Sequence, residues 1–101
     1  MKPVVAKVAA HFGIPEAELL GPSQYRSVSY PRHIAMYLLR ALCTECGQGR
    51  GMGAAEIGKV LNRSRSAVDY AVRRIAAELR AGNVETIYDV SDLEMGMDKE
   101  A

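Results

Sequence analysis

The hydrophobic positions of this chain recur at helical spacing, which predicts an all-helical fold. Segments with apolar residues three or four positions apart cover residues 4–12, 15–20, 30–44, 54–61 and 64–81. The last segment has a regular apolar stripe, formed by Val68, Ala71, Val72, Ile75 and Leu79. A further run at residues 84–95 repeats apolar residues every three positions, as a short final helix does. We therefore expect a compact all-α domain of about five to six helices.

The segments between these helices carry residues that interrupt helices. Residues 22–29 are polar and are expected to form a loop, and Pro31 suits the first turn of the helix that follows. Residues 46–53 contain four glycines, which predicts a flexible loop. Gly82 is expected to end the long helix. From Met95 onward the chain is expected to be disordered.

Two of the expected helices, at residues 54–61 and 64–81, form a helix-turn-helix pattern. Ser64 is a good N-cap for the second helix. Gly58 lies inside the first helix, where glycine costs roughly 1 kcal/mol, and this cost is explained if the second helix passes close by. In DNA-binding pairs of this kind the N-terminal residues of the second helix meet base edges in the major groove. The pattern therefore predicts that the chain binds double-stranded DNA and that the second helix contacts the bases.

The outward residues of this helix pair have side chains suited to DNA. Arginine can donate two hydrogen bonds to guanine, and serine can contact either partner of a base pair. Lysine and arginine near the turn are placed for phosphate contacts. The expected contact residues are Lys59, Arg63, Ser64, Arg65, Ser66, Asp69, Tyr70 and Arg73.

The net charge of +1 conceals an uneven distribution. Residues 1–84 hold twelve lysines and arginines against six acids, a balance of +6. Residues 85–101 hold one lysine against six acids, a balance of −5. A basic body with an acidic end is typical of a polyanion-binding domain with a solvated tail. We therefore divide the chain into a DNA-binding domain at residues 1–84 and an acidic segment at residues 85–101.

Several other function classes have little support in the sequence. No apolar run approaches the ~20 residues of a transmembrane helix, so we expect no membrane partner and a cytoplasmic, nucleoid-associated protein. Cys43 and Cys46 form a single C-x-x-C motif. Such a motif occurs in redox-active cysteine pairs and as half of a zinc site. Only His11 and His33 are available as further zinc ligands, and not at a zinc-type spacing. We therefore expect no metal, no cofactor, no small-molecule ligand and no enzyme activity.

No dimerisation helix is evident, so a monomer is expected.

Two blocks of sequence carry a family resemblance. Residues 26–38 read RSVSYPRHIAMYL, and residues 56–75 read EIGKVLNRSRSAVDYAVRRI. With the opening segment VVAKVAAHFGIPEAELL, they resemble the C-terminal DNA-binding domain (domain IV) of the bacterial chromosomal replication initiator DnaA. The resemblance covers about residues 4–80 in the same order. It implies a helix-turn-helix fold of the Trp repressor and DnaA domain IV type, with a role in replication-initiation control or transcription regulation.

The resemblance also implies two further DNA contacts. Arg26 falls on the family's loop arginine that enters the minor groove, where an arginine senses narrow, A·T-rich geometry. Arg32 aligns with a basic residue near the DNA backbone. The family's base-reading run Asp-His-Thr-Thr is replaced here by SRSA at residues 64–67. We therefore expect the docking mode to be kept and the preferred DNA sequence to differ.

Alternatives remain at this point. The chain has no G-x-x-x-x-G-K-[ST] nucleotide-binding loop, so it is expected to be a stand-alone protein or an excised domain, with Met1 and the acidic end favouring the first. A generic helix-turn-helix transcription regulator unrelated to replication shares the same pattern. A protein-interaction domain that uses the basic helical face is a further alternative.

Overall fold

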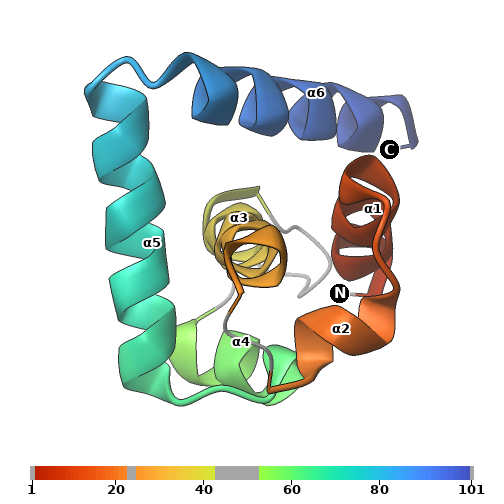
Figure 1. Ribbon diagram of the computed structural model, residues 1–101, viewed down its shortest axis with the longest axis vertical. Helices are drawn as coiled ribbons and strands as arrows, with labels where there is room; N and C mark the ends of the chain where they lie inside the picture. The colour runs from red at the N-terminus through yellow and green to blue at the C-terminus, as the bar shows by residue number, and fades with distance from the viewer. Residues whose placement is uncertain (1, 23–24, 43–52, 101) are drawn as a thin grey trace.

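The computed structural model describes residues 2–22, 25–42 and 53–100, and these residues form an all-helical domain. The helices are α1 (Lys2–Phe12), α2 (Glu16–Leu20), α3 (Arg26–Leu42), α4 (Ala54–Leu61), α5 (Arg65–Arg80) and α6 (Val84–Glu100). Helix α3 runs through the centre, and the other helices surround it (Figure 1). The predicted all-α fold with a helix-turn-helix is confirmed.

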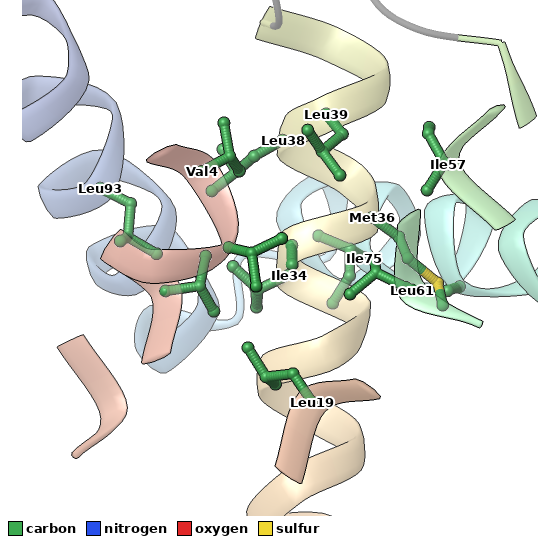
Figure 2. Packing of buried hydrophobic residues seen from close by; sticks show 14 of the residues in the cluster. Val4, Leu19, Ile34, Met36, Leu38, Leu39, Ile57, Leu61, Ile75 and Leu93 are labelled. Atoms are coloured by element: carbon green, nitrogen blue, oxygen red, sulfur yellow. The ribbon is translucent and has the colours of Figure 1, made fainter. Parts of the chain in front are cut away.

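The central position of α3 follows from its sequence, which is apolar on more than one side. Ile34, Ala35, Met36, Leu38 and Leu39 are all buried, so successive faces of the helix need partners. Figure 2 shows those partners approaching α3 from the surrounding helices. Each fully buried aliphatic side chain contributes about 1.5–3 kcal/mol to folding. The partners labelled in Figure 2 are Val4, Leu19, Ile57, Leu61, Ile75 and Leu93.

Helix α3 begins at Arg26, so the loop predicted for residues 22–29 is wrong for its second half. The carbonyl oxygen of Tyr25 accepts hydrogen bonds from the backbone N–H groups of Val28 (2.9 Å) and Ser29 (2.7 Å). Pro31 therefore lies in the second turn, where it leaves one backbone carbonyl without its helical donor. Burial of Val28 in the extended first turn helps to offset this cost.

Helix α6 extends to Glu100 and is longer than the short helix that the sequence predicts. Asn83 caps its start, since the Asn83 side-chain oxygen accepts from the Thr86 N–H at 3.2 Å. Val90 and Leu93 are buried in the core, and Asp89 accepts a hydrogen bond from the Tyr30 hydroxyl at 2.8 Å. The first half of α6 is thus a packed element and not a solvated tail. The division of function at residue 84 stays a prediction.

Two sequence predictions concern residues outside the described ranges. Cys43 and Cys46 lie there, as does the glycine-rich segment up to residue 52. Among the described helices, none is both long enough and apolar enough to cross a membrane.

Candidate nucleic-acid interface

The turn between α4 and α5 is held by backbone hydrogen bonds to one carbonyl. Asn62 adopts a left-handed conformation (φ 55°), and its N–H donates to the carbonyl oxygen of Gly58. The Arg63 N–H donates to the same oxygen at 2.8 Å. Ser64 then begins α5, and its hydroxyl oxygen accepts from the Ala67 N–H at 3.2 Å. The prediction that Ser64 is the N-cap is confirmed, and the turn is rigidly connected to α4.

Gly58 allows the turn between α4 and α5 to lie close against α4. It is buried, and a Cβ atom there would overlap the carbonyl oxygen of Arg63. The carbonyl carbons of Arg63 and Ser64 would lie 3.5 and 3.7 Å from the same Cβ. All three neighbours are backbone atoms, which have little freedom to move. The glycine is therefore explained by the close approach of the turn backbone at Arg63 and Ser64, whereas the sequence predicted that the second helix itself would pass close by.

The outer face of α5 brings the predicted base-contacting residues together. Arg65 and Ser66 are exposed in the first turn, Asp69 is half-buried, and Tyr70 is 56% exposed in the second turn. Arg73 is exposed one turn further along. One open depression on this face is lined by Ser66, Asp69, Tyr70, Arg73 and Arg74. The face is therefore polar and hollowed.

Two residues of this surface, His33 and Arg74, are absent from the predicted set. The His33 and Tyr70 rings meet edge to face at 6.1 Å, which joins α3 to α5. Arg74 donates from Nη1 to the Tyr70 hydroxyl at 2.9 Å and lies 3.7 Å from a Glu78 carboxylate oxygen. Burial lowers the pKa of His33, and the positive charges of Arg74 and Arg32 lower it further. In the sequence, the contact between Tyr70 and Arg74 is indicated only by their spacing of four residues, which places them on the same face of a helix.

Arg32 and Arg63 both bond to backbone carbonyl oxygens at the end of α2. Arg32 is 4% exposed, and its Nε donates to the Leu19 carbonyl oxygen at 2.8 Å. Its Nη2 lies 3.2 Å from the carbonyl oxygens of Glu18 and Gly21. Arg63 also donates to the Gly21 carbonyl oxygen. These carbonyls lie at the C-terminal end of α2, where helical donors run out, although Glu18 also accepts from the Gly21 N–H at 3.3 Å. Both guanidinium groups therefore hold the end of α2, and a phosphate contact by either stays a prediction.

The same arrangement perturbs the titration of Arg32. Burial lowers its pKa, and the nearby charge of Arg63 lowers it further. The sequence predicts that each arginine contacts a DNA phosphate. In the structure each guanidinium group donates hydrogen bonds to backbone carbonyl oxygens at the end of α2. Both side chains nevertheless line a hollow that also includes Ser66, Ala67 and Tyr70 of α5.

Arg26 lies at the start of α3 and not in a loop. Its guanidinium carbon is 4.9 Å from the centre of the Tyr30 ring, a cation–π distance. Its Nη2 lies 3.6 Å from a Glu85 carboxylate oxygen on α6, and its side chain remains 70% exposed. Together with His33 and Arg74, Arg26 lines a hollow between α3 and α5. Arg26 is therefore accessible beside the face of α5, at the N-terminal end of α3.

Three cations of the helix-turn-helix have no partner within the described part of the chain. Lys59, Arg65 and Arg73 are exposed and form no hydrogen bond or ion pair with the residues described. Because such charges are fully hydrated, an anion can bind them without breaking an internal contact. The outer face of α5 is consequently suited to a polyanion.

Comparison with known proteins identifies the family of this fold. The family described as the bacterial dnaA protein helix-turn-helix matches residues 1–75. The chain belongs to this bacterial DnaA helix-turn-helix family. The match includes α1 to α4 and most of α5, so it contains the helix pair and the central helix. The family resemblance found in the sequence is confirmed.

Individual relatives of the DnaA family agree with this assignment. The chromosomal replication initiator protein DnaA of Thermomicrobium roseum is 37% identical over 79 residues, which are 77% of this chain and 16% of that protein. The DnaA protein of Deinococcus radiodurans is 33% identical over 79 residues, 78% of this chain and 16% of that protein. The DnaA protein of Thermus thermophilus is 34% identical over 73 residues, 71% of this chain and 15% of that protein. The chain thus spans about one sixth of the length of these relatives.

Proposed function

We propose that this chain binds double-stranded DNA through α4 and α5 and recognises a specific sequence, in the control of replication initiation. The observation that carries the proposal is the exposed face of α5, where Arg65 and Arg73 have no partner among the described residues. Membership of the DnaA helix-turn-helix family supports the same function, because the relatives are named chromosomal replication initiators.

The first turn of α5 performs the recognition. Arg65 donates to guanine O6 and N7 in the major groove, and Ser66 contacts a neighbouring base. The free backbone N–H groups at the start of α5 attract a phosphate, and the helix dipole adds to that attraction. Lys59, exposed on α4, contacts the DNA backbone without sequence preference.

A second contact comes from α3. Arg26 projects beside α5 with most of its side chain exposed, so it reaches the adjacent minor groove. The negative potential of a narrow minor groove attracts the guanidinium group more strongly than Glu85 does at the protein surface. DNA binding therefore replaces the Arg26–Glu85 contact.

Site selection from random duplex DNA, followed by fluorescence anisotropy in a salt series, tests the proposal. The wild-type chain is expected to bind its selected site more tightly than random duplex. Arg65→Ala is expected to weaken binding to the selected site by roughly 5- to 150-fold and to relax one base position. The matched control is Arg80→Ala, which removes an exposed arginine from the last turn of the same helix.

The phosphate contact has a different signature. Lys59→Ala is expected to weaken binding to all duplexes alike and to reduce the salt slope by about one unit. Absence of duplex binding at low salt would contradict the proposed function and favour the protein-interaction alternative. Unchanged specificity in Arg65→Ala would show that α5 docks in another orientation.

A further inference from the structure

One carboxylate lies in the middle of the cationic face of α5. Asp69 follows Arg65 by one helical turn and precedes Arg73 by one turn, so all three side chains share a face. Asp69 lines the open depression together with Ser66, Tyr70, Arg73 and Arg74. The position is central to the surface proposed to meet DNA, where negative charge is unfavourable.

No structural role within the described residues accounts for Asp69. Its carboxylate forms no hydrogen bond with those residues and is more than 4.0 Å from the charged atoms of their arginines and lysines. It is the fifth residue of α5, beyond the first turn in which a carboxylate gains from the helix dipole. Apart from the weak attraction of arginines four residues away, stability of the domain thus gives no reason for an acid at this position.

An acid on a DNA-binding face needs a hydrogen-bond donor from the DNA. Phosphates repel the carboxylate, and contact with the bases removes its water. The donors in the major groove are the amino groups of cytosine and adenine. The adenine amino group lies between two acceptors, adenine N7 and thymine O4. The cytosine amino group has an acceptor, guanine O6, on one side only. A carboxylate is therefore less repelled at cytosine than at adenine.

We propose that Asp69 accepts a hydrogen bond from the exocyclic amino group of a cytosine and so selects cytosine at one position of the bound site. This inference rests on the proposed function, because it assumes that α5 enters the major groove. Arg65, one turn earlier, selects guanine, which presents the acceptors O6 and N7 in the major groove where cytosine presents an amino donor. The two residues together specify a target that contains at least one guanine and one cytosine at fixed spacing.

Base-by-base affinity measurements on the selected duplex test the role of Asp69. The wild-type chain is expected to prefer cytosine at one position by roughly 5- to 150-fold over the other bases. In Asp69→Asn the carboxamide both donates and accepts, as adenine N7 and N6 require, so the preference at that position is expected to change from cytosine to adenine. The other positions, including the one read by Arg65, are expected to keep their preferences.

Two further variants separate base recognition from general charge and from folding. Asp92→Asn removes the same charge from an exposed position on α6 and is expected to leave the cytosine preference intact. Asp69→Ala lacks both hydrogen-bonding atoms and is expected to abolish the preference at the same position. It serves as the second test if Asp69→Asn does not fold, which circular dichroism reveals.

The outcomes distinguish this inference from the function on which it rests. Specific binding without a cytosine preference at any position overturns the role of Asp69 and leaves the proposed function in place. The same conclusion follows if both Asp69 variants retain the wild-type preference. Failure of the wild-type chain to bind any duplex overturns the proposed function and this inference together.

Discussion

Substitution of Gly58 by alanine tests the close contact that positions α5. The added methyl group would overlap the Arg63 carbonyl oxygen and lie near two further backbone carbons. Arg63 is tied back to Gly58 through its own N–H at 2.8 Å, so its peptide group has little room to move away. We therefore expect Gly58→Ala to destabilise the domain, although alanine is the better helix former.

The magnitude follows from two opposing terms. Replacing a glycine inside a helix by alanine stabilises it by about 0.5–1 kcal/mol. Forcing a methyl group into a packed site costs about 1–3 kcal/mol, and the upper half applies here because the neighbours are backbone atoms. The net loss is expected to be about 1–2.5 kcal/mol. For a domain of this size, that loss lowers Tm by about 4–20 °C.

Urea and thermal denaturation followed by circular dichroism measure this loss. Gly53→Ala is the matched control, because among the described residues its Cβ atom would meet a Glu56 oxygen alone, at an ordinary 3.8 Å. Gly53 is the N-cap of α4, so the control is expected to change stability by less than about 1 kcal/mol. A Gly58→Ala protein as stable as the wild type, or more stable, would refute the reasoning. It would mean that α4 and the turn are farther apart than the structure places them.

Three other predictions test features of the fold. Arg32→Ala removes the buried donors to the α2 carbonyls and is expected to lower the unfolding free energy by about 1.5–3 kcal/mol in urea denaturation, whereas Arg80→Ala changes it by less than about 0.5 kcal/mol. Burial raises the pKa of Tyr30 to about 12, and the hydrogen bond to Asp89 contributes to the rise. Because the tyrosine of the unfolded chain loses this proton near pH 10, the unfolding free energy is expected to fall as the pH rises from 10 to 12. The fall is expected to be less steep in Tyr30→Phe, and an equal dependence on pH in both proteins would contradict this. Leu93→Ala is expected to cost about 2–5 kcal/mol, since α6 completes the core, and a negligible loss would mean that α6 is dispensable.

Local patterns were sufficient to predict the helix-turn-helix. Ser64 has a short acceptor side chain before a regular apolar stripe, and both signals act within a few residues of each other. The glycine at position 58 indicated a close contact, which the structure places at the turn and not at α5 itself. The bounds of α4 and α5 therefore agree with the sequence prediction to within one residue.

The start of α3 could not be predicted from local signals. Pro31 favours a helix that begins just before it, and the polar residues 26–29 agree with that interpretation. The additional turn is instead accompanied by distant contacts: Arg26 lies 3.6 Å from Glu85, and the Tyr30 hydroxyl donates to Asp89 and lies 3.2 Å from the Thr86 hydroxyl, all on α6. Tertiary contacts of this kind have no signature in the sequence around residue 26.

The candidate site was predictable on α5 and less so outside it. Helical spacing places Arg65, Asp69 and Arg73 on one face without any knowledge of tertiary structure. Whether an arginine projects outward or bonds to the backbone of another helix depends on packing, as Arg32 illustrates. His33 joins the surface because α3 lies against α5, a proximity that the sequence does not encode locally.

The carbonyl oxygen of Gly21 acts as a common anchor for two helices. It accepts from Arg32, which belongs to α3, and from Arg63, which belongs to the turn before α5. The two bonds tie the second turn of α3 and the turn before α5 to one atom, which restricts how far the N-terminal parts of α3 and α5 can move apart. Arg26 and Arg65 are the first residues of these two helices. If both arginines contact DNA as proposed, the site must keep a constant number of base pairs between its minor-groove and major-groove elements, and an insertion of one base pair is expected to prevent simultaneous contact.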